Sequence, residues 1–276
     1  MAASPDSSGR TGYFLILLRF LLGILVLSLF HGPVLADSID LLTMGEAFYM
    51  TGDLHEAARI LSGASSSEIP AHAQRALYLL ARISLLTGDF RQAKEYFERS
   101  ADIEGARSAG RWMALAGIGD TLYLSGRYEE AIRRYRMALR ETASNDEGAV
   151  ISLKVALCEQ SLGREKAAVT RLREALNEIP VLSGWVGREE EFYHSMVMVG
   201  IDPAQAAEVR IFIVAGPVKG NFRVDEVIGT DIPVKETRKE GASYLEFGPL
   251  TDSVEAMILS EKIRSRFQVP VEIIKR

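Results

Sequence analysis

The sequence has 276 residues, of which 47% are hydrophobic and 25% are charged, as in folded globular proteins. Its length leaves room for about two domains, and its formal net charge of −5 excludes the basic excess of a nucleic-acid-binding chain. The single cysteine, Cys158, excludes an internal disulfide and a cysteine-rich zinc site, and we expect it to be a buried, inert thiol.

The N-terminal residues carry the pattern of an export signal. An uninterrupted apolar core runs over residues 20–30, a Gly-Pro pair then breaks the helix, and small residues follow at the positions that a signal peptidase reads. This pattern predicts a signal peptide over residues 1–36, cleaved before Asp37. The alternative is an uncleaved membrane anchor over residues 13–30. In both cases the rest of the chain lies beyond the membrane, which in a bacterium is the periplasm.

Residues 37–180 contain one pattern four times. A small residue is followed by Gly, Ala, a bulky residue and a further Ala, and the copies begin 36, 38 and 37 residues apart. The four copies are Gly45, Gly52, Ala57, Leu61 and Ala64; Ala81, Gly88, Ala93, Phe97 and Ala101; Gly119, Gly126, Ala131, Tyr135 and Ala138; and Ala156, Gly163, Ala168, Leu172 and Ala175. This period predicts an all-α solenoid of helical hairpins, in which the Gly ends the first helix of each pair.

The repeated pattern resembles the tetratricopeptide repeat (TPR), which has small, Gly, Ala, aromatic and Ala residues at these spacings. The resemblance implies that a protein or extended peptide binds along the concave face, lined by the first helix of each pair. By spacing, the residues predicted to face this groove are Tyr49, Tyr78, Arg82, Asp120 and Tyr123. The alternative is that these side chains only cover the neighbouring hairpin.

Residues 181–206 are predicted to form a capping helix and a linker. The segment 189–199 places Phe192, Met196 and Val199 on one stripe, which suits a helix that covers the open end of the array. A Gly-Ile-Asp-Pro sequence then ends this helix and begins the linker.

After about residue 209 the helical period changes to alternation, which predicts strands. The predicted strands are 209–215, 232–237, 242–247 and 271–274. The pair Gly216-Pro217 is expected to end the first strand, and a helix is predicted from Asp252 or Ser253 through Phe267. Residues 207–276 are therefore predicted to form a small α+β βαββαβ sandwich, with a short first helix within 221–228.

The junction between the third strand and the last helix carries a second resemblance. Residues 243–250 read Ser-Tyr-Leu-Glu-Phe-Gly-Pro-Leu, and the capped helix that follows opens with Glu255-Ala256. This junction resembles the sporulation-related repeat (SPOR) domain, although Leu250 stands where that family usually has Phe. The resemblance implies a bacterial envelope protein that binds peptidoglycan glycan strands, especially strands without peptides, on the sheet face that helices leave uncovered.

Alternation along the strands assigns the side chains of that face. Leu245 and Phe247 are directed into the core, which leaves the neighbouring residues outward. The predicted glycan-binding residues are Phe212, Val214, Tyr244 and Glu246. The two rings are expected to stack on sugar faces, and the Glu246 carboxylate is expected to accept hydrogen bonds from hydroxyls. The alternative is that this apolar face is buried against the helical array.

The sequence predicts no enzyme. No histidine has a metal-binding partner at helical spacing, and no phosphate loop or nucleophile elbow is present, so no catalytic residue, metal or cofactor is predicted. One hypothesis is a non-enzymatic periplasmic protein that docks a protein partner through the array and holds peptidoglycan through its C-terminal domain, in cell division or wall organisation. The other is an exported assembly scaffold whose C-terminal sandwich caps the array or mediates dimerisation without binding glycan.

Overall fold

The computed structural model describes residues 34–105, 108–189, 191–192, 210–218, 232–239 and 241–276. Residues 41–276 form one compact unit, which contains the sheet and all described helices after α2. Most of the predicted signal peptide, the capping helix beyond Phe192, the linker and the predicted first helix of the sandwich lie outside the described residues. Within those described ranges, no helix is long and apolar enough to cross a membrane.

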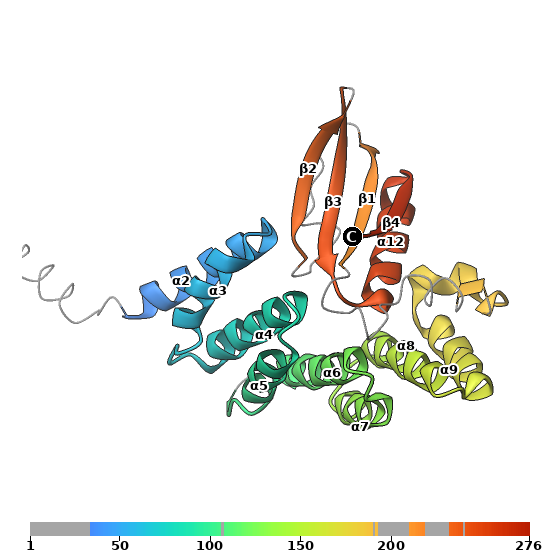
Figure 1. The fold of residues 1–276 in the computed structure, drawn as a ribbon, viewed down its shortest axis with the longest axis horizontal. Coiled ribbons are helices and arrows are strands. Elements are labelled where there is room, and N and C mark those ends of the chain that lie inside the picture. The colour runs from blue at the N-terminus through green and yellow to red at the C-terminus, as the bar shows by residue number, and fades with distance from the viewer. Residues whose placement is uncertain (1–33, 106–107, 190, 193–209, 219–231, 240) are drawn as a thin grey trace, which may run out of the picture. The chain divides into compact units, whose positions relative to one another are not determined.

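Four helical hairpins follow one another along the chain, as predicted (Figure 1). Each hairpin packs against the next, and their small and bulky residues lie in buried clusters along the array. The hairpins are α2 (Val34–Met50) with α3 (Leu54–Ala64), α4 (Pro70–Leu86) with α5 (Phe90–Ala101), α6 (Ser108–Leu124) with α7 (Tyr128–Leu139), and α8 (Asn145–Ser161) with α9 (Glu165–Glu178). A 3-10 helix, η1 (Pro180–Trp185), follows α9.

The turn inside each hairpin depends on the predicted glycine. The four turn glycines have positive φ angles between 72° and 81°, a conformation that side chains with a Cβ rarely adopt. In the first two hairpins the next residue, Asp53 or Asp89, caps the second helix by accepting a hydrogen bond from a backbone N–H three residues on. Gly and Asp together therefore end one helix and begin the next.

The small and bulky members of the pattern pack against each other. A Cβ added to Gly45 would lie 2.7 Å from Leu61, and one added to Gly119 would lie 2.5 Å from Tyr135. In these two repeats the bulky residue packs within its own hairpin. Phe97 does both: it packs in its hairpin's core, and a Cβ on Gly117 of the next hairpin would lie 2.4 Å from its ring.

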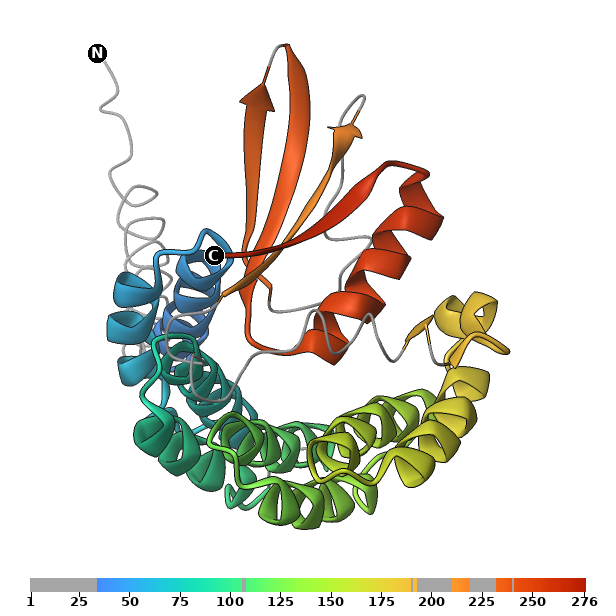
Figure 2. The same ribbon diagram turned by 45° about the vertical axis from the view of Figure 1, so that its right-hand side comes forward.

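The C-terminal part contains a four-stranded antiparallel sheet with a helix on one face, as predicted (Figure 2). The sheet order is β2-β3-β1-β4. Its elements are β1 (Ile211–Val218), β2 (Val234–Lys239), β3 (Ala242–Leu250), α12 (Ser253–Phe267) and β4 (Val271–Lys275). The side chain of Asp252 caps α12 by accepting hydrogen bonds from the backbone N–H groups of Val254 and Glu255.

The prediction that Gly216-Pro217 ends the first strand is wrong. β1 continues to Val218, and β3 likewise continues through Gly248-Pro249 to Leu250. The pairing between β1 and β3 shifts register beside each Gly-Pro pair, so each proline lies at a bulge where no ladder hydrogen bond is needed from it. Both glycine N–H groups still donate, Gly216 to the carbonyl of Pro270 and Gly248 to that of Pro233.

Alternation along the strands gives the sheet two different faces. The inner face, formed by Ile211, Ile213, Ala215, Leu245 and Phe247, is buried together with residues of α12. The outer sheet face, defined as the side of Phe212, Val214, Tyr244 and Glu246, contains only half-buried or exposed side chains among its described positions. The predicted directions of these side chains are confirmed.

Candidate functional site

Two regions carry the residues that the sequence singles out. The first is the contact between the helical array and α12, which we call the interface network: Arg82, Asp120, Tyr135, Lys154, Asp252 and Glu255. The second is the outer sheet face. Both lie within residues 41–276, a single compact unit.

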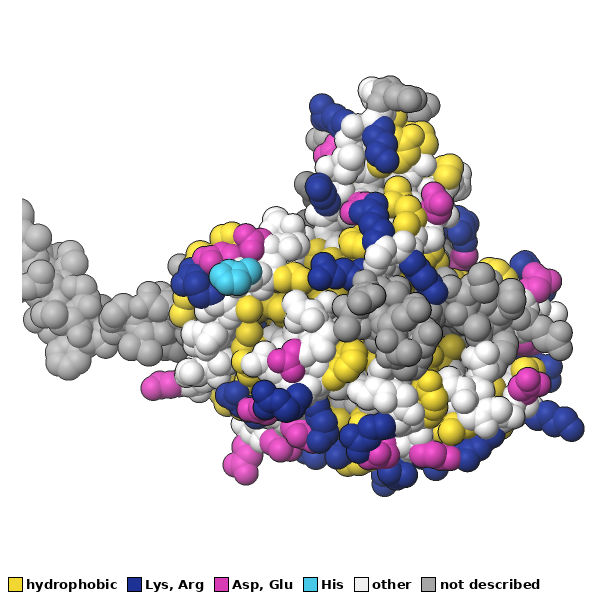
Figure 3. Space-filling model, in the orientation of Figure 1, with side chains coloured by type: hydrophobic (Ala, Val, Ile, Leu, Met, Phe, Trp, Pro, Cys, Tyr) yellow, Lys and Arg dark blue, Asp and Glu magenta, His cyan; other side chains and the backbone are white. Residues whose placement is uncertain are grey.

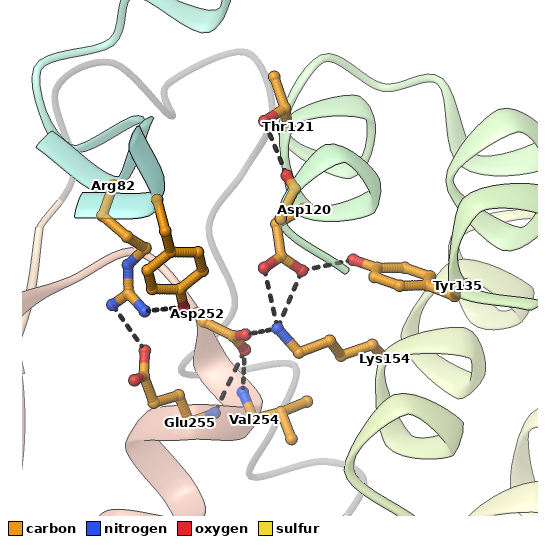
Figure 4. A network of polar contacts seen from close by, with 10 residues as sticks. Arg82, Asp120, Thr121, Tyr135, Lys154, Asp252, Val254 and Glu255 are labelled. Atoms are coloured by element: carbon orange, nitrogen blue, oxygen red, sulfur yellow. Dashed lines mark hydrogen bonds and ion pairs between the residues drawn. The ribbon is translucent and has the colours of Figure 1, made fainter. Parts of the chain in front are cut away.

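The interface network centres on Lys154 of α8 (Figure 4). Its ammonium group donates to both carboxylate oxygens of Asp120, at 2.9 Å each, and forms a further ion pair with Asp252. The Tyr135 hydroxyl donates to Asp120 at 2.7 Å. The side chain of Lys154 is only 11% exposed, so these carboxylates take the place of most of the water molecules that would hydrate the ammonium group. One cation thus joins α6 of the array to the start of α12.

A second ion pair lies one turn further along α12. Arg82 of α4 donates to a carboxylate oxygen of Glu255 at 3.0 Å and, over 3.3 Å, to the Tyr78 hydroxyl. Because Asp252 and Glu255 are three residues apart at the first turn of a helix, both carboxylates are directed toward the array. The positive N-terminal end of the α12 dipole also stabilises both negative charges.

Apolar contacts surround this charged centre. One stripe of α12, formed by Val254, Met257 and Ile258, shares a buried cluster with residues of α8, α9 and η1. The opposite stripe, formed by Ala256, Leu259 and Ile263, completes the core beneath the sheet. The helix therefore has two buried faces, one for the array and one for the sheet.

The electrostatics of the interface network suit attachment rather than catalysis. Burial alone would lower the pKa of Lys154, but Asp120 and Asp252 outweigh it and hold this pKa well above its ordinary value. The ammonium group therefore stays protonated and cannot act as a base or nucleophile at neutral pH. Burial raises the pKa of Asp120, whereas for Asp252 the nearby Lys154 outweighs burial and lowers the pKa.

A cavity of about 380 Å³ lies beside the network, between the array and α12. Its array side includes Tyr78, Arg82, Trp112 and Asp120, and its α12 side includes Glu255. A volume of this size suits one or two side chains of a bound segment.

The structure brings together three of the five predicted groove residues. Tyr78, Arg82 and Asp120 line the cavity, whereas Tyr123 lines an adjoining small pocket and its ring packs against Tyr128 at 5.5 Å. Tyr49 is 1% exposed and belongs to the core cluster of the first two hairpins. Two of the five, Arg82 and Asp120, are bonded to Glu255 and Lys154 of the same chain.

On the outer sheet face each predicted ring lies on a glycine of the neighbouring strand. A Cβ added to Gly248 would be 3.1 Å from the Phe212 ring, and one added to Gly216 would be 2.8 Å from the Tyr244 ring. Each ring therefore occupies the space that a side chain at the neighbouring glycine would need. β1 and β3 thus repeat one arrangement, an aromatic residue followed four positions later by Gly-Pro.

Glu246 and Phe212 share a partner that the sequence reasoning missed. The guanidinium of Arg276 donates to both Glu246 carboxylate oxygens, at 2.7 and 3.2 Å, and lies 4.8 Å from the centre of the Phe212 ring. In the space-filling view, basic side chains lie beside hydrophobic ones on the surface that the sheet forms (Figure 3).

Neither region offers a metal site. Among the residues that the structure describes, no three His, Cys, Asp or Glu side chains are grouped for a metal ion. Cys158 is buried, and burial raises the pKa of its thiol, so it remains protonated.

One feature of the sequence could have indicated that Lys154 is paired with buried carboxylates. It is the only charged residue in the apolar run 149–158, where an unpaired charge would be costly. Nothing in the sequence marked Arg276, because its partners lie on other strands.

A comparison with protein-family models matches residues 72–140 to the tetratricopeptide repeat family. The match covers α4 to α7, the second and third hairpins. A search among curated proteins returned no match. Residues 72–140 are therefore similar to TPR repeats, a repeat type that commonly serves as a scaffold for contacts between proteins.

Proposed function

We propose that this chain is a non-enzymatic protein of the bacterial cell envelope. Its TPR-type array docks a protein partner, and its C-terminal sheet binds peptidoglycan glycan strands in the periplasm. The N-terminal export pattern supports the location, and the SPOR-like junction at residues 243–250 supports the ligand.

The observation that carries the glycan proposal is the outer sheet face. Phe212 and Tyr244 each pack over a glycine of the neighbouring strand and remain partly accessible. Aromatic rings of this kind can stack on the apolar faces of sugar rings, and they lose little side-chain entropy on binding because packing already holds them.

The array contributes the second half of the proposal. The cavity lined by Tyr78, Arg82 and Trp112 lies on the first helices of the hairpins, where aromatic and charged residues together suit a peptide segment. The acids that line this cavity, Asp120, Asp252 and Glu255, are ion-paired with Lys154 and Arg82, which does not suit them to act as the acid and nucleophile of a cell-wall hydrolase.

Sedimentation with purified peptidoglycan tests the glycan half. We expect residues 37–276 to sediment with walls at moderate salt, and the double variant Phe212→Ala/Tyr244→Ala to bind about tenfold more weakly or worse, because truncation of an aromatic anchor commonly costs more than 1 kcal/mol. Tyr96→Ala, a half-buried ring on the array, is the control and should bind normally. Absence of the unchanged protein from the wall pellet would remove the glycan function.

A second function is favoured by the interface network. Because α12 bonds to the array through Lys154 and Arg82, the sandwich can serve as a cap for the array in an assembly scaffold that binds no glycan. On this alternative neither the unchanged protein nor Tyr244→Ala sediments with walls, and the substitution alters thermal stability or oligomer size in light scattering. The two measurements on one variant therefore separate the two functions.

A further inference from the structure

The first turn of α12 occupies the groove in which the sequence predicts a protein partner. Arg82, one of the predicted groove residues, donates to the Glu255 carboxylate at 3.0 Å. Lys154 joins Asp120, another predicted groove residue, to Asp252 at the start of the same helix. Figure 4 shows Arg82 and Lys154 directed toward these two carboxylates from separate helices of the array. Part of the predicted groove is therefore filled by the protein's own C-terminal helix.

The array-facing side of α12 has the chemistry of a groove ligand. Its two carboxylates, Asp252 and Glu255, are three residues apart and lie on one side of the first turn. An apolar stripe continues this side and is almost completely buried: Val254 is 0%, Met257 5% and Ile258 9% exposed. Amphipathic helices with apolar residues at this spacing bind in grooves of other proteins. The segment thus combines the features by which one protein recognises another, although it belongs to the same chain.

The fit of α12 in the groove leaves two donors without acceptors. The cavity of about 380 Å³ beside Glu255 is lined by Arg82 and Trp112. The Nε atom of Arg82 and the Nε1 atom of Trp112 are buried, and neither has a hydrogen-bond partner in the part of the chain that the structure describes. A buried donor without an acceptor destabilises the closed arrangement. A partner that enters the cavity with carbonyl or carboxylate oxygens would satisfy donors that α12 leaves unpaired.

Exchange of carboxylates on the two cations conserves the ion pairs. Lys154 and Arg82 keep a negative partner if carboxylates of another molecule replace those of α12, so no buried charge is left unpaired. The displaced helix stays with the sheet, because its opposite stripe completes the core beneath the strands. Its array-facing stripe then meets water, which disfavours release when no partner is bound. The closed arrangement is therefore the resting state of the isolated protein.

We propose that α12 is an autoinhibitory occupant of the array, which excludes the partner until an acidic helix replaces it on Lys154 and Arg82. This inference rests on the proposed docking of a protein partner by the array. The partner carries two carboxylates about one helical turn apart, followed by apolar residues, as α12 does. Partner binding and attachment of α12 to the array are then mutually exclusive, so a bound partner also frees the sheet from the array.

Fluorescence anisotropy with a synthetic copy of α12 tests this inference. The probe is a labelled, acetylated peptide with the sequence of residues 251–268, added to residues 37–276. In the unchanged protein the attached α12 competes at a high effective concentration, so we expect weak binding. In the open variant, Asp252→Asn/Glu255→Arg, asparagine keeps the helix cap and arginine repels Arg82. We expect this variant to bind the peptide about tenfold more tightly or better.

Two controls show whether binding depends on these carboxylates. A peptide carrying Asp252→Asn and Glu255→Gln should bind the open variant about tenfold more weakly, because the charged hydrogen bonds are lost. Glu236→Arg changes a carboxylate of β2 that is 53% exposed, and this variant should bind the peptide as weakly as the unchanged protein. If the open variant shows no cooperative unfolding, Glu255→Gln replaces it, with an expected gain of about threefold.

The outcomes separate this inference from the proposed function. Equally tight binding to the unchanged protein and the open variant leaves the array as a docking surface and overturns the autoinhibition alone. Equal binding of the acidic and neutral peptides to the open variant overturns the exchange of carboxylates. Absence of binding to both folded proteins overturns the inference together with docking of an acidic helix in this groove, whereas sedimentation with walls reports on the glycan function independently.

Discussion

Replacing Lys154 with methionine is expected to lower the free energy of unfolding by about 3–5 kcal/mol, because two buried carboxylates lose their shared cation. Asp120 and Asp252 both bond to this ammonium group, whose side chain is 11% exposed. Methionine has a similar length and removes the charge together with its N–H donors. Chemical denaturation followed by circular dichroism measures the loss.

Two further variants show whether the unpaired carboxylates cause this loss. Lys166→Met changes an exposed lysine of α9 and should change stability by less than about 0.5 kcal/mol. The triple variant Asp120→Asn/Lys154→Met/Asp252→Asn should recover more than half of the loss, because asparagine keeps the cap of α12 without a charge. If Lys154→Met costs no more than Lys166→Met, the network does not hold α12 to the array.

Replacing Phe97 with alanine is expected to cost about 3–5 kcal/mol, the usual penalty for removing a fully buried ring. Phe97 has no exposed surface, packs edge-on against Tyr78 at 5.7 Å, and occupies the space above Gly117. The same denaturation measurement applies. Arg91→Ala, on the exposed side of the same helix, is the control.

Substitution of Gly117, which lies against the Phe97 ring, gives a more specific test of this packing. Gly117→Ala alone should cost about 1–3 kcal/mol, because its Cβ would lie 2.4 Å from the Phe97 ring. In the double variant with Phe97→Ala this clash is absent, so the combined loss should be smaller than the sum of the single losses. Strict additivity would mean that the two residues do not pack together.

The sequence predicted those features that depend on neighbouring residues in the chain. Each turn glycine of the array has the positive φ that its pattern implied, and Asp252 caps α12 as expected. Both depend on local backbone geometry, which is encoded within a few residues. The inward and outward sides of β1 and β3 were also predictable, because strand alternation is a local rule.

Features made by distant residues were not predictable. Lys154 and Asp252 are 98 residues apart, and no spacing rule links them. Gly216-Pro217 looked like a strand end because proline lacks an N–H, but pairing with β3 and β4 accommodates it in a bulge. Arg276 meets Phe212 only because β4 pairs with β1, which depends on the topology of the sheet.

Because α12 has two buried faces, it couples the helical array to the C-terminal sheet. A substitution at Met257 is constrained by the array and one at Ala256 by the sheet, although the two positions are adjacent. Through its two faces and its ion pairs with Lys154 and Arg82, this helix can transmit a load from the strands to the hairpins. A truncated protein that keeps α12 with only the sheet, or with only the array, would expose one apolar stripe of this helix to water. Separating the two parts therefore requires that the exposed stripe of α12 be redesigned.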